Sequence, residues 1–111
     1  ARAYLEPYDS WANRIAILRF IQDIPMTPND TSWQTLVEIE KKLSKIQKVP
    51  MLILWGGNDF CFTRHFYEEW QVRFPDAESH LFPQAGHYIL EDAFEPIAPL
   101  ITAFLEKHII P

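Results

Sequence analysis

The sequence predicts an α/β fold with two parallel strands, and three features of its 111 residues support this prediction. The segment Met51–Trp55 is apolar at every position, which is typical of a strand covered on both faces in a parallel sheet. A helical pattern and a second short strand follow, and this order favours a βαβ unit. Because two parallel strands are too few for a free-standing sheet, we expect the chain to be part of a larger domain.

The first helix is expected from about Ser10 to Gln22. Either Asp9 or Ser10 offers an oxygen that caps its first turn, and Pro25 stops the run. The polar residues 25–30, which include two prolines, then form the only stretch that resembles a linker.

A second helix is expected between this connector and the first strand. Residues Asp30 to Ser32 supply caps, and Pro50 closes the helix. Its apolar residues lie on one stripe: Trp33, Leu36, Leu43 and Ile46.

Three further elements are expected after the first strand. A helix spans about Thr63 to Phe74, with aromatic residues spaced four apart, and a second strand fits Glu78 to Phe82. The last helix runs from about Pro96 to His108, because proline is tolerated near a helix start, where its missing N–H has no partner in any case.

Composition and charge exclude several classes of protein. Hydrophobic residues make up 48% of the chain and charged residues 23%, which is a globular and not a disordered composition. The net charge is -5, and an acidic chain without a basic face is a poor candidate for binding nucleic acid or an anionic membrane. The lysines at 41, 42, 45 and 48 neighbour Glu38 and Glu40, so we interpret them as a solvated helix face.

Cysteine use and hydropathy bear on the compartment. The single cysteine, Cys61, excludes an internal disulfide framework and favours a reducing environment. The longest apolar run has five residues, Met51–Trp55, which is too short to span a membrane. Since no signal peptide is visible either, we expect a cytoplasmic protein or a piece of one.

Two loops carry candidate chemistry, and each follows one of the predicted strands. The loop 56–62 contains Asp59, and the loop 83–88 contains His87. Ligands of open α/β sheets bind beyond the carboxyl ends of the strands, so adjacent parallel strands would bring these two side chains together. A carboxylate that holds an imidazole in one tautomer raises its basicity, which general-base chemistry near neutral pH requires.

The residues of these loops resemble a known family. The sequence Trp55-Gly56-Gly57-Asn58-Asp59 and the run from Ala85 to Ala93 look like the C-terminal part of an α/β-hydrolase. The segment Asp59–Phe62, with the run from His87 to Ala93, is similar to haloalkane dehalogenases and olefin β-lactone decarboxylases. The resemblance covers essentially the whole chain.

The resemblance implies roles for particular residues and segments. Asp59 and His87 would be the catalytic acid and histidine, no cofactor would be needed, and three aromatic residues would contact a small apolar substrate: Phe60, Phe62 and Tyr88. Residues 1–30 would be the cap-exit helix and linker, and residues 31–111 the C-terminal part of the α/β-hydrolase core.

The resemblance also implies a nucleophile that this chain lacks. No G-x-S-x-G and no comparable Gly-x-Asp-x-Gly turn occurs in the sequence. An aspartate elsewhere would attack a haloalkane or β-lactone and form an ester, and His87 would then activate a water while Asp59 stabilises the imidazolium. If the missing nucleophile is serine, the same pair would serve an esterase.

Other interpretations stay open. Asp59 alone could be an ordinary turn residue, and His87 alone a loop histidine. Asp59, Cys61 and His65 match no usual zinc spacing, so we expect no metal. The chain could also be a non-catalytic fragment: its open strand edge and apolar face predict association with the N-terminal portion of the same protein or with a second copy.

Overall fold

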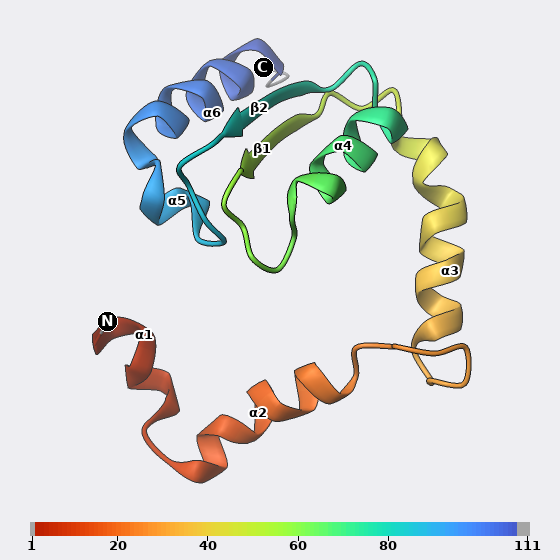
Figure 1. Cartoon of the computed structure of the whole chain (residues 1–111), viewed down its shortest axis with the longest axis vertical. Helices are drawn as coiled ribbons and strands as arrows, with labels where there is room; N and C mark the ends of the chain where they lie inside the picture. Colours follow the sequence, from red (N-terminus) through yellow and green to blue (C-terminus); the bar gives the residue numbers. More distant parts are fainter. Residues whose placement is uncertain (1, 109–111) are drawn as a thin grey trace. The chain divides into compact units, whose positions relative to one another are not determined.

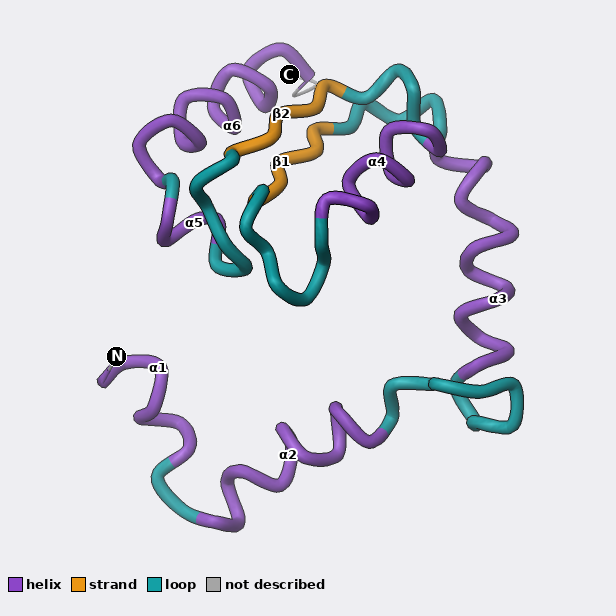
Figure 2. The backbone as a smooth tube through the Cα atoms, in the orientation of Figure 1, coloured by secondary structure: helices purple, strands orange, loops and turns teal. Residues whose placement is uncertain are grey.

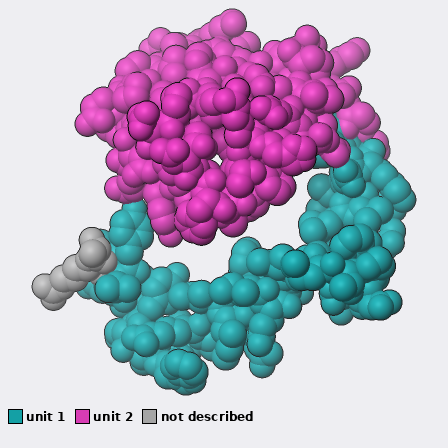
Figure 3. All heavy atoms as spheres, in the orientation of Figure 1, with its two compact units in different colours: residues 1–43 teal, residues 44–111 magenta. Residues whose placement is uncertain are grey.

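A computed structural model describes residues 2–108, and the chain divides into two compact units, Ala1–Leu43 and Ser44–Pro111 (Figure 3). This division lies later in the chain than the boundary after residue 30 that the resemblance implies. The assignment of residues 1–30 to a cap exit stays a prediction. Residue 1 and residues 109–111 of the two expected domains lie outside the described residues.

The first unit is helical (Figure 2). Its elements are α1 (Arg2–Leu5), the 3-10 helix η1 (Glu6–Tyr8), α2 (Trp11–Gln22) and α3 (Trp33–Lys42). The prediction for α2 is confirmed, because the Ser10 hydroxyl accepts a hydrogen bond from the Asn13 N–H at 3.2 Å and so caps the first turn.

The predicted caps of α3 are wrong. Ser32 precedes the helix, but its hydroxyl donates to the carbonyl of Asp23 at 2.6 Å. The Asp30 carboxylate accepts the N–H groups of Met26 and Thr27 at 2.7 and 2.6 Å. Both side chains therefore fold the connector, since short polar side chains bind nearby backbone groups readily.

The end of α3 also differs from the prediction of one helix up to Pro50. The α-helix ends at Lys42, and a 3-10 helix, η2 (Leu43–Ile46), continues it. The Leu43 N–H bonds to the carbonyl of Glu40, three residues back, which is the 3-10 pattern common in the last turn of helices.

Two parallel strands form the sheet of the second unit, as predicted. Strand β1 (Leu52–Gly56) pairs with β2 (Glu78–Phe82), with Leu52 opposite Glu78 and Gly56 opposite Phe82. The connecting helix is α4 (Arg64–Arg73). Figure 1 shows that the two strands point the same way, so their following loops leave from one end of the sheet.

Two helices complete the unit after β2. The short α5 (Ile89–Asp92) was not predicted, and α6 (Phe94–His108) begins earlier than expected. Pro96 thus lies in the first turn of α6, where its missing N–H costs little. A second proline, Pro99, lies inside the helix.

The core of the second unit is built from β1, from the loop after β2, and from the segments of α4 and α6. The buried hydrophobic residues are Ile53, Tyr67, Phe74, Ala85 and Ile97. Within β1 only Ile53 and Gly56 are buried, so in the part of the chain that the structure describes this strand is covered less than its apolar sequence predicts. Among the described helices, none is both long and apolar enough to cross a membrane.

Candidate active site

The loops after β1 and β2 are joined by their backbones. The Gly57 N–H donates to the carbonyl of Phe82 at 2.8 Å, and the Asn58 N–H donates to that of Ala85 at 2.9 Å. A Cβ atom at Gly56 would overlap the Gly86 carbonyl and lie 2.7 Å from the carbonyl oxygen of Ala85. Glycine is therefore needed at position 56 because two backbones approach closely.

Asp59 is anchored within its own loop. Its Oδ1 atom accepts the N–H groups of Cys61 and Phe62 at 2.8 and 2.9 Å, and its side chain is 9% exposed. Burial raises the pKa of this carboxyl. The amides of Phe62 and Cys61 and the imidazole of His87 together lower it by more than burial raises it, so the pKa lies below its ordinary 3.8. Asp59 is thus an anion at neutral pH.

The structure brings Asp59 and His87 together across the two loops. The Nδ1 atom of His87 lies 3.1 Å from both carboxylate oxygens of Asp59. Because an ionised carboxylate only accepts hydrogen bonds, Nδ1 carries the proton and Nε2 is left as the basic nitrogen. The imidazole is 32% exposed. This geometry is that of an oriented general base, and the catalytic roles of both residues stay predictions.

The three aromatic residues predicted as substrate contacts surround the imidazole. The ring centroids of Phe60, Phe62 and Tyr88 lie 5.6, 5.7 and 5.5 Å from that of His87. Phe60 is 83% exposed and Tyr88 is 67% exposed. All three rings therefore offer apolar surface beside the histidine.

A cavity of about 170 Å³ lies beside the Asp59–His87 pair. Its lining residues are Leu54, Trp55, Gly56, Asp59, Phe62, Gly86, His87 and Ile89. Phe62 belongs to this lining, whereas Phe60 and Tyr88 do not. The sequence interpretation did not single out Leu54 or Ile89, and the position of Leu54 near the carboxyl end of β1 is the signal that points to it.

The single cysteine and two of the other histidines have different surroundings. Cys61 is exposed, and its backbone N–H donates to Asp59. The His80 imidazole pairs with Glu78 at 3.0 Å, and the His108 ring lies against Phe104. Across residues 2–108, no group of three or more histidine, cysteine or acidic side chains is placed to hold a metal ion.

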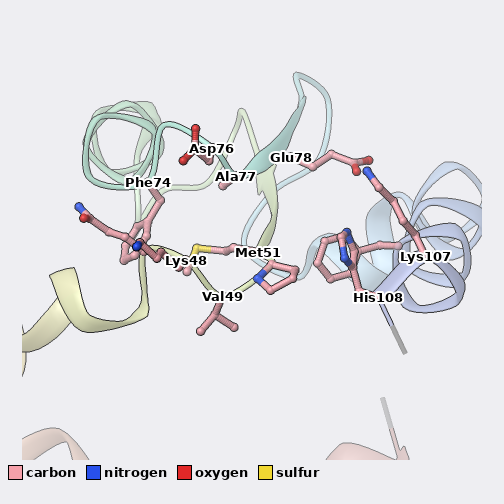
Figure 4. A pocket seen from close by; sticks show the side chains of 12 residues that line it. Lys48, Val49, Met51, Phe74, Asp76, Ala77, Glu78, Lys107 and His108 are labelled. Atoms are coloured by element: carbon pink, nitrogen blue, oxygen red, sulfur yellow. The ribbon is translucent and has the colours of Figure 1, made fainter. Parts of the chain in front are cut away.

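A second cavity, of about 220 Å³, lies at the amino ends of the strands (Figure 4). Met51, which precedes β1, and Glu78, which begins β2, both line it, together with Lys107 and His108 of α6. It therefore lies at the end of the sheet opposite the Asp59–His87 pair.

Comparison with known proteins adds a second kind of information. No protein-family model matches the chain. Over 105 residues, 95% of the chain, it is 48% identical to a cis-3-alkyl-4-alkyloxetan-2-one decarboxylase of Shewanella oneidensis. Over 107 residues it is 44% identical to the protein of that name in Xanthomonas campestris. An oxetan-2-one is a β-lactone. The chain is similar to β-lactone decarboxylases.

The extent of this similarity is informative as well. The chain spans 33% and 36% of the length of these two relatives, which is consistent with a portion of a larger protein. A weaker match covers 59 residues, at 34% identity, of the dihydrolipoyllysine-residue acetyltransferase component of an acetoin cleaving system from Pseudomonas putida. The identities of 48% and 44% to the two decarboxylases support the predicted resemblance to olefin β-lactone decarboxylases.

Proposed function

We propose that these residues are the C-terminal portion of an α/β-hydrolase-fold β-lactone decarboxylase, with Asp59 and His87 acting in its reaction. The Asp59–His87 contact of 3.1 Å carries the proposal, because it joins two loops at the carboxyl ends of adjacent parallel strands. The 48% identity to a protein named for the decarboxylation of a dialkyl β-lactone supports this choice of substrate over a haloalkane.

The chemistry requires a nucleophile outside the chain. A carboxylate there attacks the alkyl carbon that bears the ring oxygen, forms an ester at that carbon and breaks its C–O bond, so the opened ring carries a free carboxylate, while the Asp59 anion keeps the His87 imidazole in place. Loss of CO₂ from this free carboxylate moves the electron pair of its C–C bond into the new alkene and expels the ester oxygen, so the nucleophile is regenerated and no water is consumed. His87 takes a proton from solvent before the substrate binds and keeps it throughout, so the imidazolium stabilises the carboxylate charge of the opened ring, and Asp59 stabilises the imidazolium.

Hydrolysis is the competing outcome for the same intermediate. If Nε2 of His87 takes a proton from water, the water adds to the ester and the product is a β-hydroxy acid. A haloalkane would release halide along the same route, and a serine nucleophile would make the pair part of an esterase. The products therefore separate these alternatives.

The surroundings of the pair suit an alkyl substrate. The rings of Phe60, Phe62 and Tyr88 present apolar area next to the reacting nitrogen, and alkyl chains gain free energy when such area leaves water. No step requires a cofactor. The nucleophile would come from the N-terminal portion of the same protein, or else the chain associates with itself and has no activity.

The test uses the full-length protein that contains this sequence. We expect it to convert a cis-3,4-dialkyl β-lactone into alkene and CO₂, measured by gas chromatography, and His87→Gln to abolish conversion while circular dichroism stays unchanged. His80→Gln serves as the matched control, because that imidazole lies on β2 and pairs with Glu78.

Two outcomes would contradict the proposal. Conversion by His87→Gln within a few-fold of the unchanged protein removes His87 from the reaction. Release of halide from a haloalkane, or cleavage of a simple ester, with no alkene formed from the lactone, replaces decarboxylation by one of the alternative reactions.

A further inference from the structure

We propose that Asp92 is a positioning residue for His87, an inference that rests on the proposed function of the pair. Asp92 is the last residue of α5 and makes hydrogen bonds on both sides of the histidine. Its Oδ2 atom accepts the Gly86 N–H at 2.7 Å, and its own N–H donates to the Tyr88 carbonyl at 3.0 Å. One residue thus holds the backbone immediately before and immediately after His87.

The Glu91 N–H also donates to the Tyr88 carbonyl, at 2.8 Å, so the contact that depends on the Asp92 side chain is the one to Gly86. The start of the loop is fixed where Ala85, which is 2% exposed, accepts the Asn58 N–H. Among the described residues, the hydrogen bonds of the His87 ring are those that join its Nδ1 atom to Asp59. Between Ala85 and the ring, the direction of the backbone at His87 depends on Asp92. That direction in turn decides where Nε2 lies relative to a substrate.

The strength of the Gly86–Asp92 contact suits a positioning role. A short N–H···O bond to an ionised acceptor is stronger than a bond between neutral groups. The Asp92 carboxylate is exposed to solvent. The short helix α5 brings it back to Gly86, because the Tyr88 carbonyl accepts the N–H groups of both Glu91 and Asp92.

Gly86 offers a second way to disturb the same contact. A Cβ atom at this position would lie 3.2 Å from Oδ2 of Asp92 and 3.9 Å from the Asn58 carbonyl oxygen. The first distance is tighter than ordinary contact, and the carboxylate is the group that is free to rotate away. Gly86→Ala is therefore expected to displace the Asp92 side chain without breaking the backbone link to Asn58.

The experiment compares Asp92→Ala with Asp92→Asn in the full-length protein. Asparagine keeps an acceptor oxygen for the Gly86 N–H, whereas alanine does not. We expect Asp92→Ala to lower kcat for the β-lactone about 10- to 100-fold with KM changed less than about two-fold, because a misplacement of about 1 Å costs up to 100-fold. Asp92→Asn should retain kcat within about three-fold. Glu106→Ala, which removes an exposed acid of α6, is the charge control.

A second readout does not depend on activity. The Nδ1 proton of His87, bonded to a carboxylate, gives a far-downfield proton resonance in water. We expect this signal to broaden or disappear in Asp92→Ala and to persist in Asp92→Asn. If the unchanged protein shows the signal but forms no alkene, the proposed function fails while the signal of the variants still decides the role of Asp92.

The proposal is overturned if Asp92→Ala keeps both the signal and kcat within two-fold of the unchanged protein. It is also overturned if Asp92→Asn loses as much as Asp92→Ala, because the lost charge would then be the cause. If Asp92→Ala does not fold, Gly86→Ala supplies the same two readouts: a weaker signal and a lower kcat support the role, and unchanged values refute it.

Discussion

The indole N–H of Trp55 donates a hydrogen bond to the main-chain carbonyl of Phe62 at 2.8 Å. Trp55 lies near the end of β1, and Phe62 lies at the far end of the loop that carries Asp59. The N–H of the same Phe62 donates to the Asp59 carboxylate. The backbone of Phe62 therefore joins Trp55 on one side and Asp59 on the other, so the position of Asp59 depends on Trp55.

Replacing Trp55 by phenylalanine tests this closure. Phenylalanine keeps an aromatic ring beside Tyr67, whose centroid lies 6.2 Å from that of Trp55, but it removes the N–H donor. We expect the free energy of unfolding in urea to fall by about 1 kcal/mol, the usual net value of one hydrogen bond. In the full-length protein kcat should fall about five-fold. If Trp55→Phe is as stable and as active as the unchanged protein, the argument is contradicted.

Gly56→Ala is expected to be more damaging. The added Cβ would overlap the Gly86 carbonyl and crowd that of Ala85, and neither backbone group can move without separating the two loops. We expect a loss of about 1–3 kcal/mol or more in the free energy of unfolding, typical of overpacking. Gly86→Ala is the control, since there the nearest atom is the tip of a side chain. A smaller loss for Gly56→Ala than for Gly86→Ala would contradict the argument.

Alanine substitutions of Phe60 and Phe62 are expected to differ in their effects on substrate binding and on the free energy of unfolding. Phe60 is 83% exposed, so Phe60→Ala should change the free energy of unfolding by less than about 0.5 kcal/mol. Losing its apolar contact with a long alkyl chain should raise KM for the β-lactone about five-fold, equivalent to about 1 kcal/mol. Phe62→Ala should also lower stability, because its ring packs edge-on against Phe66 at 5.6 Å. An unchanged KM for Phe60→Ala would remove Phe60 from the substrate contacts.

Strand β1 and the meeting of Asp59 with His87 were predictable from the sequence for physical reasons. A uniformly apolar segment that ends in two glycines has few alternatives to a strand, and parallel neighbours bring their following loops to one end of the sheet. The bounds of β2, Glu78–Phe82, were predicted as the structure has them.

The parts that escaped prediction depend on contacts that no local pattern encodes. Helix α5 has four residues, fewer than the helical period needs to show itself, and forms because the Tyr88 carbonyl accepts two N–H groups. The role of Asp92 depends on that turn. The Asp30 carboxylate was predicted to cap α3, but it folds the connector instead, since two nearer amides compete for it.

The pKa of Asp59 gives the last prediction, on stability against pH. Burial raises this pKa, the amides of Phe62 and Cys61 and the His87 imidazole lower it, and the net value lies below 3.8. Between the folded and unfolded values the folded state binds fewer protons. The stabilisation is therefore complete above the ordinary value of 3.8 that holds in the unfolded chain, and it is lost as pH falls through the folded pKa.

Chemical unfolding from about pH 2 to pH 5, the range in which carboxyl groups titrate, measures this effect. The free energy difference between the unchanged protein and Asp59→Asn should be largest near pH 5 and shrink as the solution is acidified, because protonation removes the same charge that asparagine lacks. Asp76→Asn, at an exposed acid between α4 and β2, controls for the loss of one surface charge. A difference for Asp59→Asn that stays constant down to about pH 2 would mean that the amides and the imidazole do not hold the Asp59 anion in the folded state.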